Sequence, residues 1–159
     1  MTNQDVAKNF ARGDNKGHTE NMYIEGNTIY SYGSHFPIAV RTGKTTEVGG
    51  GEIVLFNSDG YSNTTRRHES HVRSALHNGW YQLIEVPTEI LKEYIYAHNN
   101  GVVGIRISSM ATEYLTKKEQ ELWLKAQRAR KLHTKEWLTE QAMDVKHQKS
   151  LFVNRMVSL

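Results

Sequence analysis

Short runs in which apolar and polar residues alternate are frequent in the first part of the chain. In MYIEGNTIYSYG, Tyr23 and Ile29 belong to two such runs on either side of Glu25-Gly26-Asn27, where Gly and Asn tolerate a tight hairpin turn. In SHFPIAVRT, the residues Phe36, Ile38 and Val40 alternate onto one face. These patterns predict three strands, the first two of which form a hairpin.

The third strand and the strands after it are expected to differ in burial. Pro37 has no backbone donor, which places the third strand at a sheet edge or at a bulge. EIVLFN, residues 52–57, has an unbroken apolar centre, which is typical of a strand buried on both faces. WYQLIEVP, residues 80–87, predicts another strand, and VVGIRIS, residues 102–108, predicts the last one.

Helical spacing of apolar residues appears in the remaining segments. It predicts short helices over residues 2–12, 63–76 and 88–99, with a polar loop over residues 13–20. Thr116 and Glu119 have the spacing of a capping box, which predicts that a last helix begins at Thr116. The expected fold is α+β: an antiparallel β-sheet with short helices in residues 1–115, and a long C-terminal helical arm, residues 116–159, packed on it as one structural unit.

The arm carries two apolar stripes. The first contains Leu115, Leu122, Ala126 and Ala129, and the second contains Leu138, Ala142, Val145, Phe152 and Met156. At about 100° per residue, positions 122 and 138 point in nearly opposite directions. Two arrangements account for this: the helix breaks near His133 and folds back onto the same core, or its second half presents its stripe to a partner or a second copy.

Composition limits the class of protein. The chain has 159 residues, enough for one domain with a core, and hydrophobic residues make up 38%, which indicates a globular protein. Its formal net charge of +3 permits contact with nucleic acid or an acidic protein without requiring either. The polar N-terminus and the lack of a bilayer-length apolar run favour a cytosolic protein without membrane contact.

The chain contains no cysteine, which excludes a disulfide scaffold, a thiolate zinc site and a cysteine nucleophile. His68 and His71 could share a metal ion, but HESH lacks a third ligand at a recognisable spacing, and His18, His35 or His77 could complete a site only through the fold. No nucleophile elbow, phosphate-binding loop or dinucleotide motif occurs. We therefore predict no catalytic site, no metal and no cofactor.

The segment YSNTTRRHESHVRSAL, residues 61–76, has a basic start. Asn63, Thr64 or Thr65 could cap the helix, and His68 shares the inward face of Val72. Arg66, Arg67 and Arg73 provide cationic side chains, and the first two stand near the free amides of a helix start, where an anion is favoured. A solvated helix with a basic face is the alternative.

A second basic segment, KAQRARKLHTKEW at residues 125–137, has the highest density of positive charge. On the arm it could follow a phosphate backbone, with salt-dependent affinity. The glutamates at positions 119, 121, 136 and 140 dilute this charge, so an ordinary solvated helix face explains it equally well.

The run MYIEGNTIYSYGSHFPIA, followed at a distance by VLFNSDGYSNTTRRHESHVRSAL, resembles a small domain that recurs in phage and plasmid accessory proteins of unknown biochemistry. The resemblance covers residues 21–76, about a third of the chain. Its specific part is the pairing of the YSYGSHFPIA strand with the YSNTTRRH helix start. It implies no catalytic residues.

The length, the lack of cysteine and the long C-terminal arm are also similar to those of an anti-CRISPR protein directed against the RNA-guided nuclease of type II systems. This resemblance implies a non-catalytic inhibitor that acts in the cytosol of the host cell and occupies a surface of the nuclease–guide RNA complex. The expected partner-binding residues are Tyr61, Arg66, Arg67, Arg73, Leu138, Val145 and Phe152. Dimerisation and contact with nucleic acid stay open, and the alternative function is a small nucleic-acid-binding accessory or regulatory protein of a phage.

Overall fold

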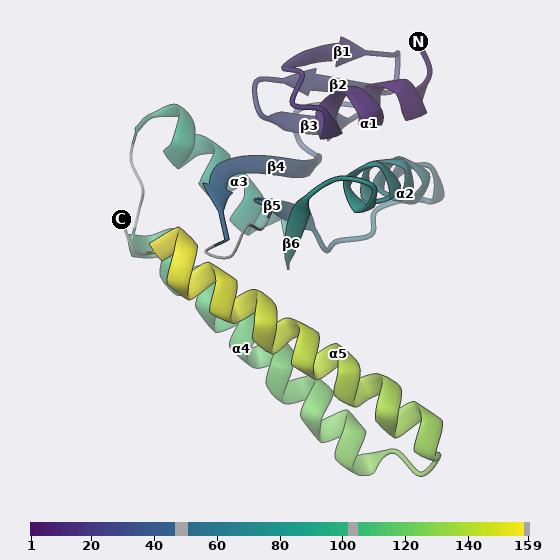
Figure 1. The fold of residues 1–159 in the computed structure, drawn as a ribbon, viewed down its shortest axis with the longest axis vertical. Helices are drawn as coiled ribbons and strands as arrows, with labels where there is room; N and C mark the ends of the chain where they lie inside the picture. The colour runs from purple at the N-terminus through teal and green to yellow at the C-terminus, as the bar shows by residue number, and fades with distance from the viewer. Residues whose placement is uncertain (47–50, 102–104, 158–159) are drawn as a thin grey trace. The chain divides into compact units, whose positions relative to one another are not determined.

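The computed structural model describes residues 1–46, 51–101 and 105–157. Its internal contacts divide the chain into two compact units, Met1–Val103 and Gly104–Leu159. Figure 1 shows a sheet with three helices in the first unit and a pair of long helices in the second. Each unit is described by itself.

The first unit is built on a six-stranded sheet whose strands lie side by side in chain order. The strands are β1 (Lys16–His18), β2 (Met22–Glu25), β3 (Thr28–Ser31), β4 (Pro37–Thr45), β5 (Glu52–Asn57) and β6 (Tyr81–Val86). Neighbouring strands from β1 to β5 are antiparallel, whereas β5 and β6 are parallel. The α+β class is confirmed, but the sheet is mixed, because a helix carries the chain from the end of β5 back to the start of β6.

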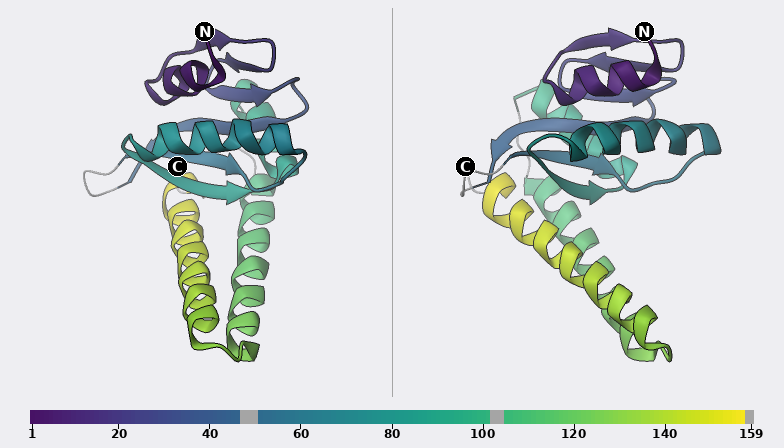
Figure 2. Two further views of the ribbon diagram at one scale, coloured as in Figure 1. Left: turned by 90° about the vertical axis from the view of Figure 1, so that its right-hand side faces the viewer. Right: turned by 45° about the vertical axis from the view of Figure 1, so that its right-hand side comes forward.

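Helices cover both faces of this sheet. They are α1 (Asn3–Ala11), α2 (Asn63–His77) and α3 (Thr88–Asn99). Figures 1 and 2 show α1 and α2 on one face and α3 on the other. All three helices were predicted from the spacing of their apolar residues, and α1 begins with a capping box in which Thr2 and Asp5 bond to each other's backbone amides.

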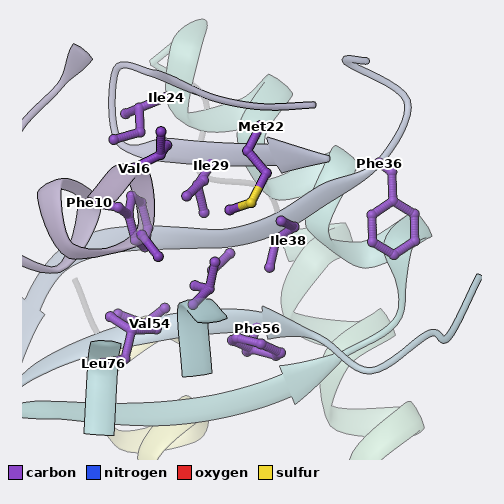
Figure 3. Packing of buried hydrophobic residues seen from close by; sticks show 13 residues of the cluster. Val6, Phe10, Met22, Ile24, Ile29, Phe36, Ile38, Val54, Phe56 and Leu76 are labelled. Carbon is purple, nitrogen blue, oxygen red and sulfur yellow. The ribbon is translucent and has the colours of Figure 1, made fainter. Parts of the chain in front are cut away.

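The core explains the burial of β5 on both faces. Successive strand side chains point to opposite sides, so Val54 and Phe56 join Phe10 of α1 and Leu76 of α2 in the core shown in Figure 3. Ile53 and Leu55 point to the side of α3, and both are completely buried. The continuous apolar run predicted this arrangement correctly.

Two details of the sheet differ from the prediction. Pro37 begins β4, which is an interior strand paired with both β3 and β5, so the edge alternative is wrong. The bulge alternative is confirmed, since the β3–β4 register shifts between Ile29 and Tyr30, beside Pro37, where the ladder lacks one donor. Residues 16–18, predicted as loop, form β1; its polar sequence carries no strand pattern, and backbone pairing with β2 makes it a strand.

The second unit is a helical hairpin. It contains α4 (Ile105–Arg128), α5 (Leu132–Leu151) and a π-helical turn, η1 (Phe152–Val157). Residues 105–108, predicted as part of the last strand, are the first turn of α4, while residues 102–104 lie outside the described residues. The predicted helix start at Thr116 is also wrong, because α4 begins eleven residues earlier, at Ile105.

The turn between the helices resolves the two apolar stripes of the arm. The chain reverses at residues 129–131, slightly before the predicted break at His133, and α5 returns alongside α4 (Figures 1 and 2). The reversal brings both stripes into one seam. Leu138, Val145 and Phe152 are 9%, 5% and 2% exposed, so these expected partner-binding residues are buried and offer no surface in this structure.

Candidate functional site

The start of α2 is the first candidate site. Ser62, in extended conformation, is the N-cap, and its Oγ accepts a hydrogen bond from the Thr65 amide at 3.1 Å. The predicted cap among residues 63–65 is therefore displaced by one position at least. Thr65 is buried, and its hydroxyl oxygen accepts a hydrogen bond from the Ser62 hydroxyl at 3.0 Å. Two bonds between Ser62 and Thr65 therefore hold the first turn of α2.

Beneath this first turn lies a buried polar network centred on His68. The ring is 2% exposed, which confirms its predicted inward face. Its Nδ1 lies 2.7 Å from the Ser31 Oγ, and its Nε2 lies 3.3 Å from the Asn3 Nδ2. The Asn3 Oδ1 in turn accepts a bond from the Thr19 hydroxyl at 2.5 Å. The network joins α1, β3 and α2, three elements far apart in the chain.

The bonding pattern assigns His68 a structural role. Burial lowers the pKa of the imidazole, and His71 lowers it further, so the ring is neutral at neutral pH. Because the Asn3 amide donates to Nε2, the ring proton is on Nδ1 and is donated to Ser31. A histidine that donates to a serine does not accept its proton, and Ser31 is 1% exposed. This Ser–His contact is therefore no activated nucleophile.

Tyr32 follows the network with an unusual backbone. Its φ of 65° is positive, which costs a residue with a Cβ about 1–2 kcal/mol. Two hydrogen bonds hold the conformation, from the Tyr32 amide to the Asn21 carbonyl at 2.7 Å and from the Ser31 amide to the Phe36 carbonyl at 3.0 Å. The ring is half exposed, and its centroid lies 5.4 Å from that of His68. No pattern in the sequence indicated this residue.

Tyr61 is the second exposed aromatic residue here. It immediately precedes the Ser62 cap and is 78% exposed, as expected for a binding residue. Its ring centroid lies 5.9 Å from that of Phe36, which is buried in the core. Both tyrosines are thus exposed to solvent and have one ring contact each with a buried side chain.

The three arginines of α2 do not form one anion cradle. Arg73 donates to Glu85 at 2.6 Å and lies over the Phe56 ring at 4.3 Å, so its charge is used within the unit. Arg66 lies beside Gly60, and Arg67 is one position along the helix, about 100° around it. Arg66 and Arg67 are both exposed. We define Tyr32, Tyr61, Arg66 and Arg67 as the tyrosine–arginine surface.

Glu69 lies on the flank of α2 between Arg66 and Arg73. Burial raises the pKa of its carboxyl to about 7, against the opposing attraction of the two arginines; Asp59 and Glu85 raise it further. Its Oε1 is buried and has no hydrogen-bond partner among the described residues. The sequence did not indicate a perturbed carboxyl here.

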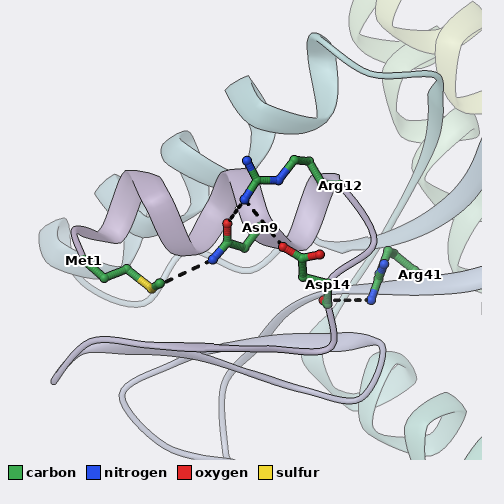
Figure 4. A network of polar contacts seen from close by, with 5 residues as sticks. All are labelled: Met1, Asn9, Arg12, Asp14 and Arg41. Carbon is green, nitrogen blue, oxygen red and sulfur yellow. Dashed lines mark hydrogen bonds and ion pairs between the residues drawn. The ribbon is translucent and has the colours of Figure 1, made fainter.

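A groove of about 490 Å³ runs between α1 and α2, lined by Gln4, Lys8, Ala11, Arg12, His71, Ser74, Ala75, Asn78 and Gly79. Arg12 is bound by Asn9 and by Asp14, as Figure 4 shows, which reduces the positive charge of the groove. Arg41 donates to the Asp14 carbonyl in the same network. Within residues 1–46, 51–101 and 105–157, no three His, Asp or Glu side chains are placed to hold a metal ion.

The second candidate site is in the hairpin. The basic segment 125–137 forms the end of α4, the turn and the start of α5. Lys125, Arg128, Arg130, Lys131 and Lys135 are all exposed. A hollow of about 450 Å³ lies farther along, lined by Trp123, Met143, Lys146, His147 and Ser150. The charge was visible in the sequence, but the hollow depends on the folding back of α5.

Comparison of the chain with protein-family models, with curated protein sequences and with solved structures found no match. None of the helices in the part of the chain that the structure describes has the length and apolar character needed to cross a membrane. Function is therefore argued from the two candidate sites.

Proposed function

We propose that this chain is a non-catalytic, mobile-element-encoded inhibitor that binds the RNA-guided nuclease of a type II CRISPR system and prevents DNA cleavage. The sequence resemblances suggest the class of partner, and the tyrosine–arginine surface supports the mode of action. The observation that carries the proposal is that Tyr32, Tyr61, Arg66 and Arg67 are all exposed, with the two tyrosine rings in contact with the buried residues His68 and Phe36.

This surface has the composition of a protein-binding hot spot, because tyrosine and arginine are enriched among the residues that dominate interface energies. Tyr32 is also preorganised. Its backbone is held by two hydrogen bonds and its ring contacts His68, whereas Tyr61 has one ring contact, with Phe36. A side chain that is already ordered loses less conformational entropy on binding, which favours affinity.

The strained backbone of Tyr32 points the same way. Glycine or asparagine would adopt a φ of 65° at lower energy, yet an aromatic residue occupies the position and is half exposed. Strain retained at an exposed side chain is typical of binding and active sites. Leu138, Val145 and Phe152 do not belong to the proposed interface, because they stabilise the hairpin.

The test is a titration of the purified protein against the assembled nuclease, guide RNA and target DNA. An inhibitor that acts by occupying a surface should abolish cleavage at about one inhibitor per nuclease when both exceed the dissociation constant. Tyr61→Ala and Arg67→Glu should each raise the required amount about tenfold or more. Trp80→Ala is the matched control, because Trp80 is 81% exposed and lies outside the tyrosine–arginine surface.

Inhibition at much less than one inhibitor per nuclease would contradict the proposal, as would full cleavage in a large excess of inhibitor. An equal loss with Trp80→Ala would contradict the assignment of the surface. Circular dichroism of each variant distinguishes lost binding from lost folding.

A further inference from the structure

The turn of the hairpin carries positive charges that the fold does not require. Arg128 ends α4, Arg130 and Lys131 form the turn, and Lys135 lies in the first turn of α5. Among residues 105–157, the structure shows no ion pair for these four side chains, whereas Lys117 pairs with Glu113 and Lys149 pairs with Glu119 elsewhere in the same hairpin. Two lysines between the ends of the hairpin are therefore paired, and the four cations at the turn are not.

The positions of Lys131 and Lys135 also oppose helix stability, whereas Arg128 lies at the favourable C-terminal end of α4. The N-terminus of α5 has no acidic residue in its first turn and no side-chain cap, and Lys131 is its N-cap residue. Positive charge is unfavourable at the positive end of the helix dipole. Stability of the isolated hairpin thus gives no reason for Lys131 and Lys135, which suggests that they interact with something negative outside the chain.

Charge is segregated around α5. Lys135 and Lys146 are eleven residues apart, so they lie within about 20° of each other and about 16 Å apart along the helix. Glu136, Glu140 and Asp144 follow one another at intervals of four residues on another side. One side of α5 is therefore basic from the turn to the hollow, and a different side is acidic.

The hollow begins at Lys146, the last cation of the basic side, and its other edge borders the acidic row, since His147 lies within about 20° of Glu140. Trp123 of α4 lines it together with Met143, Lys146, His147 and Ser150 of α5. Trp123 is half-buried, and its indole N–H donates to the Glu119 carboxylate at 3.0 Å, which holds the ring in place. Trp137, nine residues before Lys146, points about 180° away from it. The two tryptophans of the hairpin are thus differently placed with respect to the basic side.

We propose that this basic side of the hairpin binds single-stranded nucleic acid, with Arg130, Lys131, Lys135 and Lys146 contacting phosphates and Trp123 contacting a base in the hollow. A row of cations beside an aromatic ring is the arrangement that single strands recognise, because the cations follow the backbone and the ring stacks on an unpaired base. A duplex keeps its bases stacked, so it could use the cations but not Trp123. This inference does not depend on the proposed inhibition, since it concerns other residues in the other unit.

The experiment measures fluorescence anisotropy of labelled 20-nucleotide oligo-dT and oligo-U with the full chain, without any nuclease. Each phosphate contact on a single strand contributes about 0.7 to the slope of log affinity against log salt. Four contacts predict a slope of about 3, which is roughly a 50-fold loss of affinity between 50 and 200 mM salt. Similar results with both oligonucleotides indicate recognition of phosphate and base, and preference for oligo-U indicates an RNA ligand.

Charge variants test the phosphate contacts. The triple change Arg130→Ala, Lys131→Ala and Lys135→Ala should lower the salt slope by about 2. The matched control is Lys16→Ala, Lys92→Ala and Lys117→Ala, which removes the same charge from exposed positions elsewhere. An equal effect of the two triple changes would show binding through net charge alone and would overturn the assignment.

Trp123→Ala should weaken binding at least fivefold with an unchanged salt slope, because stacking involves no counterion release. Trp137→Ala is the matched control and should bind as the wild type does. Trp123 also supports the hairpin, so the Trp123→Ala variant could unfold. In that case Lys146→Glu, at an exposed position, tests the same hollow, and this variant should bind about tenfold more weakly than the wild type. Unchanged affinity in the folded variants would overturn the role of the hollow.

Three further outcomes would overturn the proposal itself. They are the absence of oligonucleotide binding at 50 mM salt, tighter binding of a duplex of the same length, and binding to phosphatidylglycerol vesicles without binding to oligonucleotides. The last result would identify an anionic membrane as the ligand of the basic side.

Discussion

The two units of the chain use polar side chains in different ways. In the first unit, side-chain hydrogen bonds join residues far apart in the sequence, as His68 does with Ser31 and with Asn3. In the second unit, most described side-chain bonds span four residues of one helix, as between Gln148 and Asp144. Lys149 and Glu119, 3.6 Å apart, are an exception that joins α4 to α5.

This difference teaches where each unit is sensitive to change. A hydrogen bond within one helix turn is formed with little loss of chain entropy and is worth a few tenths of a kcal/mol. A buried bond between distant elements requires the whole fold, and breaking it leaves unsatisfied groups that cost about 1–3 kcal/mol each. We therefore expect polar substitutions to affect the first unit most, and apolar truncations in the seam to affect the second unit.

The largest effect is expected for His68→Ala. The change removes a buried ring and leaves the Ser31 hydroxyl and the Asn3 amide without their partner. The free energy of unfolding should therefore fall by about 2–4 kcal/mol. Urea denaturation followed by circular dichroism measures it. His71→Ala, at a half-buried position three residues along, should change stability by less than about 1 kcal/mol. Similar losses in both variants would contradict the network.

Leu138→Ala should lower stability by about 2 kcal/mol, the lower end for such truncations because the side chain is 9% exposed. Met143→Ala, on an exposed part of the same helix, is the control and should have a small effect. Thermal unfolding at 222 nm is the measurement. If Leu138→Ala left stability unchanged, the seam would not be the source of hairpin stability.

Glu69→Gln should have an effect that depends on pH. The carboxyl has a pKa of about 7 in the folded chain, above its ordinary value, so the folded state holds its proton more tightly than the unfolded state. Stability is therefore lost as the pH rises from about 4.5 to 7. Glutamine removes this loss, and it should stabilise the protein by about 1–2 kcal/mol at pH 8, allowing for solvent screening.

At pH 4, where glutamate is protonated in both states, the Glu69→Gln variant should match the wild type. Glu25→Gln, which removes the same charge at an exposed position, is the control. Urea titrations at pH 4, 6 and 8 measure all three proteins. Equal stability of Glu69→Gln and wild type at pH 8 would show that Glu69 ionises normally.

The smallest effect on stability is expected for Arg66→Ala combined with Arg67→Ala. Both side chains are exposed, so the free energy of unfolding should change by less than about 0.5 kcal/mol. The melting temperature should stay near that of the wild type. Arg73→Ala should cost more, because Arg73 pairs with Glu85 and covers the Phe56 ring. The reverse order would mean that the exposed arginines serve the fold instead of a partner.

The success of sequence reasoning also differs between the units. The hairpin turn at Gly26, the doubly buried β5 and the inward face of His68 were predicted, because each depends on a local pattern of residue types. The predicted start of the helix at Thr116 was wrong. The β-branched residues before Thr116 favour a strand in isolation, but in the structure those from Ile105 onward belong to the 24-residue helix α4.

For the candidate sites, the sequence indicated Tyr61, Arg66, Arg67 and the basic segment at residues 125–137 as exposed groups. It did not indicate Tyr32, because a positive φ at a tyrosine follows from the loop closure between Ser31 and Phe36 and not from the residue itself. It left two arrangements open for the second apolar stripe, and the structure has the fold-back, in which Leu138, Val145 and Phe152 are buried instead of exposed to a partner.

The order of helical and extended segments, the apolar faces and the uneven distribution of positive charge were determined by the sequence alone, because they depend on periodicity and composition over a few residues. Only the tertiary structure decided that β6 joins the sheet in parallel, that Ser31 and Asn3 meet His68, and that α5 reverses along α4 to bury Leu138. These features require pairing of segments far apart in the chain, and that choice is made by the total area and polar groups buried in the folded state.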